Sequence, residues 1–180
     1  MNLRALLLAL LSALFLATCG PHAAGGPSES DEATMAALGT VRALHHEADV
    51  YEATGDYARA AHPIRRILAL QLPASMLEGE DVRADAFGRL AELLLHDGNP
   101  SEALALTETG LREARRESVL RARLFLVRGQ VLAELGTRAE REGRRDEAER
   151  RRAEALAAYE TSIELNQRIL GRLTDGGRKP

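Results

Sequence analysis

The chain has little of several residue types, and each scarcity limits what it can be. Its 180 residues include one cysteine, three phenylalanines, three tyrosines and no tryptophan, whereas 45% are hydrophobic and 28% are charged. A single cysteine excludes an internal disulfide and a cluster of thiolate metal ligands. Few aromatic residues argue against a β-sandwich or β-barrel, because strands favour aromatic and β-branched side chains. The net charge of −3 gives no sign of nucleic-acid binding.

Charged residues are absent from residues 5–17. This apolar run follows residues 1–4, which contain one arginine, Arg4. A basic start followed by such a run is typical of a secretory signal peptide. The run is too short for a membrane-spanning helix, which needs about 20 residues. A buried N-terminal helix is the alternative interpretation, although no polar stripe divides the run.

The only cysteine follows this run in the sequence Leu16-Ala17-Thr18-Cys19, which resembles the lipobox of bacterial lipoproteins. The resemblance implies that residues 1–18 are removed as a signal peptide and that Cys19 becomes the first mature residue, carrying acyl chains. Thr18 departs from the Gly, Ala or Ser that the family prefers there. Gly20, in place of Asp, implies an outer-membrane destination facing the periplasm. Ordinary cleavage and secretion is the alternative, but no A-x-A site lies near the end of the apolar run.

The rest of the chain divides into a linker, a helical body and a short tail. Residues 19–32 are rich in Gly, Pro and Ser and lack apolar periodicity, so we expect a flexible tether that carries the lipid on Cys19. Apolar residues recur every three or four positions over residues 33–174, which predicts an all-α domain. Residues 175–180 are expected to be a disordered tail. Helix breaks are expected at Gly55-Asp56, Leu72-Pro73 and Gly98-Asn99-Pro100, and a kink at Pro63.

Three stretches of this domain share a pattern. Gly55, Gly98 and Gly143 stand 43 and 45 residues apart, and an alanine follows each of them by five positions. A large hydrophobic residue precedes each glycine by eleven positions, and a small residue precedes it by seven. Small residues let two helices approach closely, and large ones fill the space beside them. The spacing therefore predicts an internal repeat of helix, tight turn and helix.

The segment Thr54-Gly55-Asp56-Tyr57-Ala58-Arg59-Ala60-Ala61, with Tyr51 before it and Leu72-Pro73 after it, resembles the tetratricopeptide repeat. Residues 98–104 form a second copy. Residues 143–148 form a weaker third copy, and because residues 155–159 fit the second-helix pattern better, two registers stay open there. The resemblance implies an α-solenoid of antiparallel helix–turn–helix repeats, with about three helix pairs. A plain antiparallel helical bundle is the alternative.

No pattern of residues points to catalysis. His45 and Asp49 lie four residues apart and could share a metal ion on one helix face, but no third ligand has helical spacing. An H-E-x-x-H motif, a G-x-S-x-G motif and a phosphate-binding glycine loop are all absent from the sequence. The arginine-rich segment 138–152 is interleaved with carboxylates, so we interpret it as an exposed helix stabilised by ion pairs. We therefore expect no enzyme activity, no metal and no cofactor.

In the family that the chain resembles, the first helices of the pairs line a concave groove. The matching positions here are Arg42, His45, Asp49, Glu52, Asp85, Glu92 and Leu95, with Gly88 beside them. This face is net acidic, which favours a protein or peptide segment with basic groups. The resemblances together imply a membrane-anchored lipoprotein that acts as a scaffold or adaptor at the bacterial cell envelope.

Two other functions are compatible with the sequence. A non-repeat helical bundle could be a periplasmic small-ligand carrier or enzyme, and it would have a deep closed pocket lined by convergent polar groups. A spacer or surface antigen would have neither such a pocket nor an open groove.

Overall fold

The computed structural model describes residues 28–176 as six helices, with no strand in that range. The all-α prediction is therefore confirmed for this part of the chain. The expected signal peptide, Cys19 and most of the expected tether lie outside the described residues, as does the end of the tail. The helices are α2 (Glu29–Glu52), α3 (Tyr57–Ala69), α4 (Gly79–His96), α5 (Pro100–Glu113), α6 (Val119–Arg141) and α7 (Arg145–Gly176).

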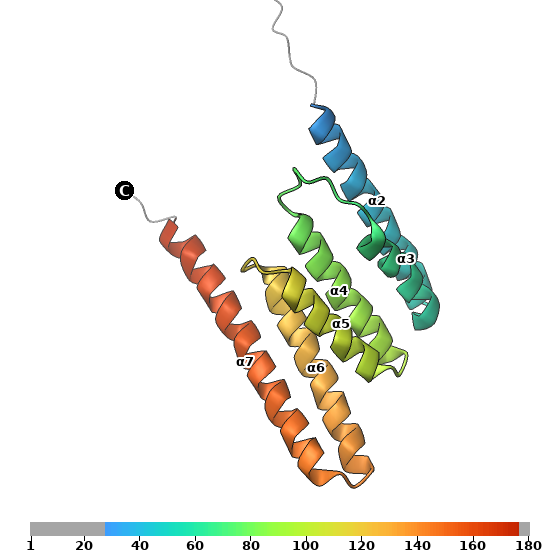
Figure 1. Ribbon diagram of the computed structural model, residues 1–180, viewed down its shortest axis with the longest axis vertical. Helices are drawn as coiled ribbons and strands as arrows, with labels where there is room; N and C mark the ends of the chain where they lie inside the picture. Colours follow the sequence, from blue (N-terminus) through green and yellow to red (C-terminus); the bar gives the residue numbers. More distant parts are fainter. Residues whose placement is uncertain (1–27, 177–180) are drawn as a thin grey trace, which may run out of the picture.

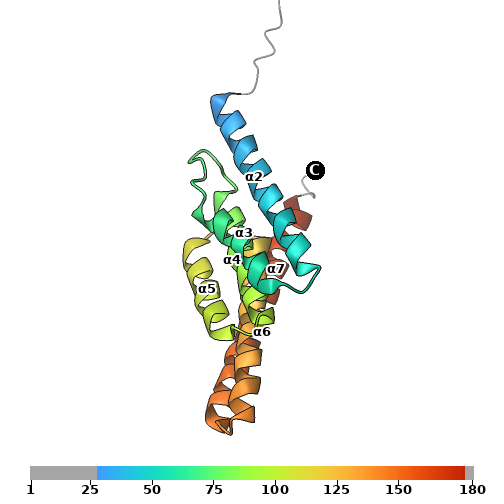
Figure 2. The same cartoon turned by 90° about the vertical axis from the view of Figure 1, so that its right-hand side faces the viewer.

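Each helix packs beside the next one along the chain, and α6 also packs against α4 (Figure 1). Short turns join α2 to α3, α4 to α5 and α6 to α7, so that three helix pairs follow one another across the view. The first half of α2 and the turn between α6 and α7 project from opposite ends of the molecule (Figure 2). None of the helices described is long and apolar enough to cross a membrane.

The three short turns share one geometry. Gly55, Gly98 and Gly143 have φ angles of 74°, 84° and 76°, a left-handed conformation that strains any residue with a Cβ. The residue after each glycine donates its N–H to the carbonyl five residues earlier, at 3.0, 2.8 and 2.8 Å, which is the Schellman pattern of a helix end. The helix ends predicted at Gly55, Gly98 and Gly143 are all confirmed.

The beginning of α2 corrects the expected boundary of the tether. The helix begins at Glu29, whereas the sequence predicts a tether up to residue 32. Ser28 accepts a hydrogen bond from the N–H of Asp31, whose carboxylate in turn accepts the N–H of Ser28. This capping box satisfies the exposed donors of the first turn, so residues 29–32 are helical. At the other end α7 reaches Gly176, two residues beyond the expected end of the domain.

The break between α5 and α6, at residues 114–118, contains no glycine or proline that would predict it from the sequence. Glu80 of α4 accepts the N–H groups of Arg115 and Arg116, both at 3.0 Å. Ser118 caps α6 by accepting the N–H of Arg121. The connection is therefore held by a carboxylate from another helix, a tertiary contact that local sequence cannot reveal.

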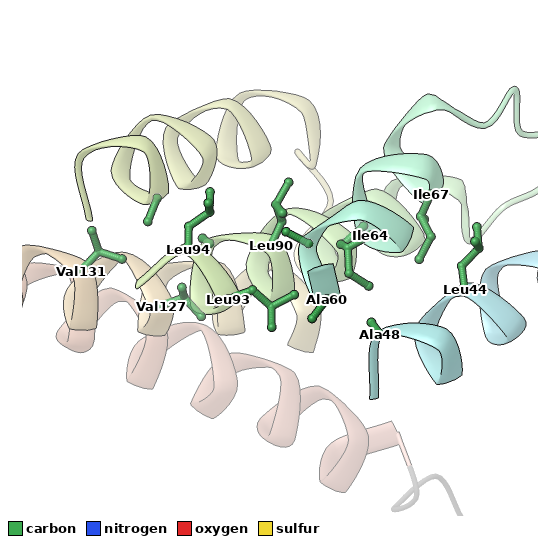
Figure 3. Packing of buried hydrophobic residues seen from close by; sticks show 14 of the residues in the cluster. Leu44, Ala48, Ala60, Ile64, Ile67, Leu90, Leu93, Leu94, Val127 and Val131 are labelled. Carbon is green, nitrogen blue, oxygen red and sulfur yellow. The ribbon is translucent and has the colours of Figure 1, made fainter. Parts of the chain in front are cut away.

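Small residues lie where the helices cross, and branched residues fill the space between them. Ala48, Ala60 and Ala91 have no exposed surface. Leucine, isoleucine and valine side chains from α3, α4 and α6 converge around them (Figure 3). Pro63 is also buried, and α3 continues through it. The kink expected at Pro63 stays a prediction.

Candidate functional site

A hollow of about 340 Å³ spans the first helices of the three pairs. It is lined by three residues of α2, four of α4 and one of α6, namely His45, Asp49, Glu52, Asp85, Arg89, Glu92, Leu93 and Arg123. We call it the charged hollow. Five of the seven groove positions expected from the sequence lie in its wall, so residues up to 47 positions apart meet in one place.

The remaining predicted positions lie elsewhere. Arg42 is exposed on α2, one turn before His45, and Gly88 is buried beside Leu124 of α6. Leu95 lines a second hollow of about 570 Å³ between α4, α6 and α7. Tyr159 of α7 lines the same hollow.

Arg89 joins α4 to α2 in the charged hollow. Its side chain is 15% exposed, and its guanidinium forms ion pairs with Asp49 and with Glu52, the second at 3.0 Å. Its other terminal nitrogen donates to the imidazole Nδ1 of His45 at 3.0 Å. The hydrogen bond from Arg89 holds the pKa of Asp49 below its usual value, because it stabilises the carboxylate form.

Arg123 joins α6 to α4 in the same way. It donates to Asp85 and to Glu92, both at 2.6 Å. Asp85 also lies 3.4 Å from the imidazole Nε2 of His45. The charged hollow is thus a continuous network in which each of two arginines is shared by two carboxylates on a face that includes three helices.

The network fixes the protonation of His45. Arginine has only donors, so the Nδ1 that faces Arg89 must accept a hydrogen bond and carry no proton. The proton of the neutral ring is then on Nε2, which faces Asp85. Burial lowers the pKa of His45, and the attraction of Asp85 opposes that effect without overcoming it.

The charge of the hollow follows from this arrangement. Four carboxylates face two guanidinium groups and a neutral imidazole, so the lining carries a net charge of −2. Sequence reasoning identified the four carboxylates but missed both arginines. Arg89 could have been found, since it lies four residues after Asp85 and three before Glu92, on the same face of α4. Arg123 could not be assigned without the packing of α6 on α4.

The arginine-rich segment 138–152 forms ion pairs within and between α6 and α7. Arg138 pairs with Glu134 at 2.8 Å along α6, and Arg152 of α7 pairs with Glu140 of α6. Arg144, in the turn, pairs with carboxylates on both sides of it. Glu140, Glu142 and Glu147, three of the carboxylates interleaved with this segment, therefore pair with its arginines.

The chemistry available in the charged hollow is ion pairing and hydrogen bonding. Its lining contains no serine, threonine or cysteine, and its carboxylates already face guanidinium groups. Across residues 28–176, no three His, Cys, Asp or Glu side chains are grouped so that they could hold a metal ion. His45 and Asp49, the pair considered for a metal from the sequence, both bind Arg89. Comparison of the chain with protein-family models, curated proteins and solved structures gives no match.

Proposed function

We propose that the chain is a lipoprotein adaptor with tetratricopeptide-like helix pairs, anchored at the bacterial cell envelope, which binds a segment of another protein in the charged hollow. The observation that carries the proposal is the composition of this hollow. Its wall is built from α2, α4 and α6, the first helix of each pair. In a stack of helix pairs these helices line the recognition face.

The lining favours a partner segment with lysine or arginine side chains. An incoming cation can bind Asp49, Glu52, Asp85 or Glu92, because each of these carboxylates shares its arginine with another. Because the lining has a net charge of −2, two positive charges from a partner would neutralise it. Such exchange of ion pairs gives specificity and speeds association more than it adds affinity.

The charged hollow also bears on the alternative of a ligand carrier or an enzyme. That alternative requires a deep closed pocket, mostly apolar, with a few convergent polar groups. The charged hollow is open and lined almost entirely by charged side chains, with Leu93 as its one aliphatic member. This lining fits a surface that recognises a polypeptide better than one that encloses a small molecule.

Charge reversal tests the binding site. In cells that produce the full-length protein, cross-linking captures the partner together with the chain. Asp49→Lys with Glu92→Lys should reduce recovery of this partner at least tenfold, because two carboxylates become ammonium groups facing a cationic segment. The matched control is Glu47→Lys with Glu102→Lys, which changes the same charge at two carboxylates that pair with Arg66 and Arg65 outside the hollow. The control breaks only surface ion pairs, which contribute about 0–1 kcal/mol each, so it should fold. The charge-reversal variant should also fold, because Arg89 keeps Glu52 as a partner and Arg123 keeps Asp85. Equal recovery from both folded variants would refute the site.

The anchor is tested separately at Cys19. Replacement by alanine removes the thiol that the lipobox resemblance assigns to acylation. The Cys19→Ala protein should move from the membrane fraction to the soluble fraction, or accumulate with its signal peptide uncleaved. Incorporation of radiolabelled palmitate into wild type but not into the variant gives a second readout. A variant that is processed normally and still fractionates with membranes would contradict lipid anchoring.

A further inference from the structure

The pairing of α6 with α7 sets which residues lie level with each other. The hydroxyl of Ser162 donates to the carbonyl of Ala122 at 2.8 Å. A Cβ on Gly129 would overlap the ring of Tyr159, so these two residues are in direct contact. Just before the N-terminus of α6, Glu117 pairs with Arg168 of α7 at 3.0 Å. The two helices therefore run antiparallel, and these contacts set which parts of α6 and α7 lie side by side.

This register aligns apolar residues in three rungs along the open side of the α6–α7 pair. Val119, Leu126 and Ala133 follow one line along α6, and Leu170, Ile163 and Leu156 lie beside them along α7, each pair within about one helical turn of the level that these contacts set. We call these six residues the apolar ladder. Successive rungs are seven residues apart on both helices. Leu156, Ile163 and Leu170 are 62%, 55% and 62% exposed, although such side chains are usually buried.

The apolar ladder lies where a further helix would pack. Within the chain, α6 packs against both members of the preceding pair, α4 and α5. In the described part of the chain no helix follows α7 to pack against α6 and α7 in the same way. Stacked helix pairs normally end in a helix whose outer face is polar. An apolar stripe with a seven-residue period is instead the pattern of a helix–helix interface.

We propose that a second copy of this chain covers the apolar ladder, with the two α7 helices antiparallel across a two-fold axis near Ile163. Leu156 and Leu170 lie seven residues on either side of Ile163, so the antiparallel arrangement places each leucine against the other one of the second copy. A two-fold interface requires a surface that is self-complementary in this way.

The charges and the area beside the ladder agree with a second copy. In this arrangement Glu160 faces Asn166 of the second copy and Gln167 faces its Tyr159, so no two like charges meet. The three rungs span about 21 Å of helix. With one more turn at each end, the face of two helices measures about 30 Å by 20 Å, and two copies bury roughly 1,200 Å², which a specific interface needs.

Disulfide cross-linking in cells tests this interface on the full chain. Ile163→Cys should give a dimer on a non-reducing gel after mild oxidation, because residues at a two-fold axis bring their Cβ atoms within the roughly 4 Å that a disulfide requires. The matched control is Leu77→Cys, since Leu77 is 82% exposed in the connection between α3 and α4. Wild type, which retains Cys19, gives the background.

One further variant decides the result. Leu156→Glu with Leu170→Glu, added to Ile163→Cys, should reduce the dimer at least tenfold, and protease resistance of the monomer shows whether it is folded. A dimer from Ile163→Cys that this change removes supports the proposal. Equal cross-linking at Leu77→Cys and Ile163→Cys would overturn it. So would an Ile163→Cys adduct with a different protein in place of a dimer, which would mean that a partner helix covers the ladder.

Discussion

At the residue scale, His45 is the side chain on which the charged hollow depends most closely. It faces Arg89 with one ring nitrogen and Asp85 with the other, and the network also includes Asp49, Glu52, Glu92 and Arg123. A second proton would go on Nδ1, where Arg89 already donates. Protonation of His45 therefore breaks the contact between the ring and Arg89 and adds a positive charge beside a guanidinium group.

This arrangement predicts how stability depends on pH. Burial makes the pKa of His45 in the folded state lower than its value of 6.5 in the unfolded chain. As the pH falls through 6.5, the unfolded state binds the proton first, so the folded state loses stability until the pH reaches the lower pKa. His45→Asn keeps an acceptor for Arg89 but cannot take up a proton.

We predict that urea unfolding shows a smaller loss of stability between pH 7.5 and pH 5.5 for His45→Asn than for wild type. All other titratable groups are the same in both proteins, so the difference isolates His45. The same loss in both proteins would show that the protonation of His45 is not linked to folding.

At the element scale, the close approach of α6 and α7 depends on Gly129, whose missing side chain makes room for the ring of Tyr159. Gly129→Ala would push the ring, and with it α7, away from α6. We predict a loss of about 1–3 kcal/mol in the free energy of unfolding, the usual cost of overpacking. The control is Gly39→Ala in α2, which meets no atom within 4 Å and should gain about 0.5–1 kcal/mol. Denaturant unfolding measures both, and a neutral Gly129→Ala would disprove the close packing.

The helices themselves were largely predictable from the sequence, and for a physical reason. Gly55 and Gly98 mark their turns because only a residue without a Cβ adopts a positive φ freely, and apolar residues every three or four positions mark the faces between them. The break at residues 114–118 was not predictable. It depends on Glu80 reaching the N–H groups of a distant segment, and that contact exists only in the folded chain.

At the scale of the whole molecule, the charged hollow exists because three helices bring distant charges together. The resemblance to the tetratricopeptide repeat already implied that His45, Asp49 and Glu52 share one face of α2. What the sequence could not predict was that Arg89 and Arg123 would neutralise half of the carboxylate charge, because their partners lie 31 to 40 residues away. The site is therefore a network of ion pairs within the mixed but net acidic face expected from the sequence.

The measurement that tests the central claim most directly is site-specific photo-cross-linking in cells that produce the full-length protein. A photoreactive amino acid replaces Arg42, which is exposed on α2 one turn before His45, or Glu108, which is exposed on α5. We predict one dominant protein adduct from position 42, absent from position 108 and lost when Asp49→Lys and Glu92→Lys are added. The same adducts from both positions, or none from position 42, would contradict a protein-binding role for this face.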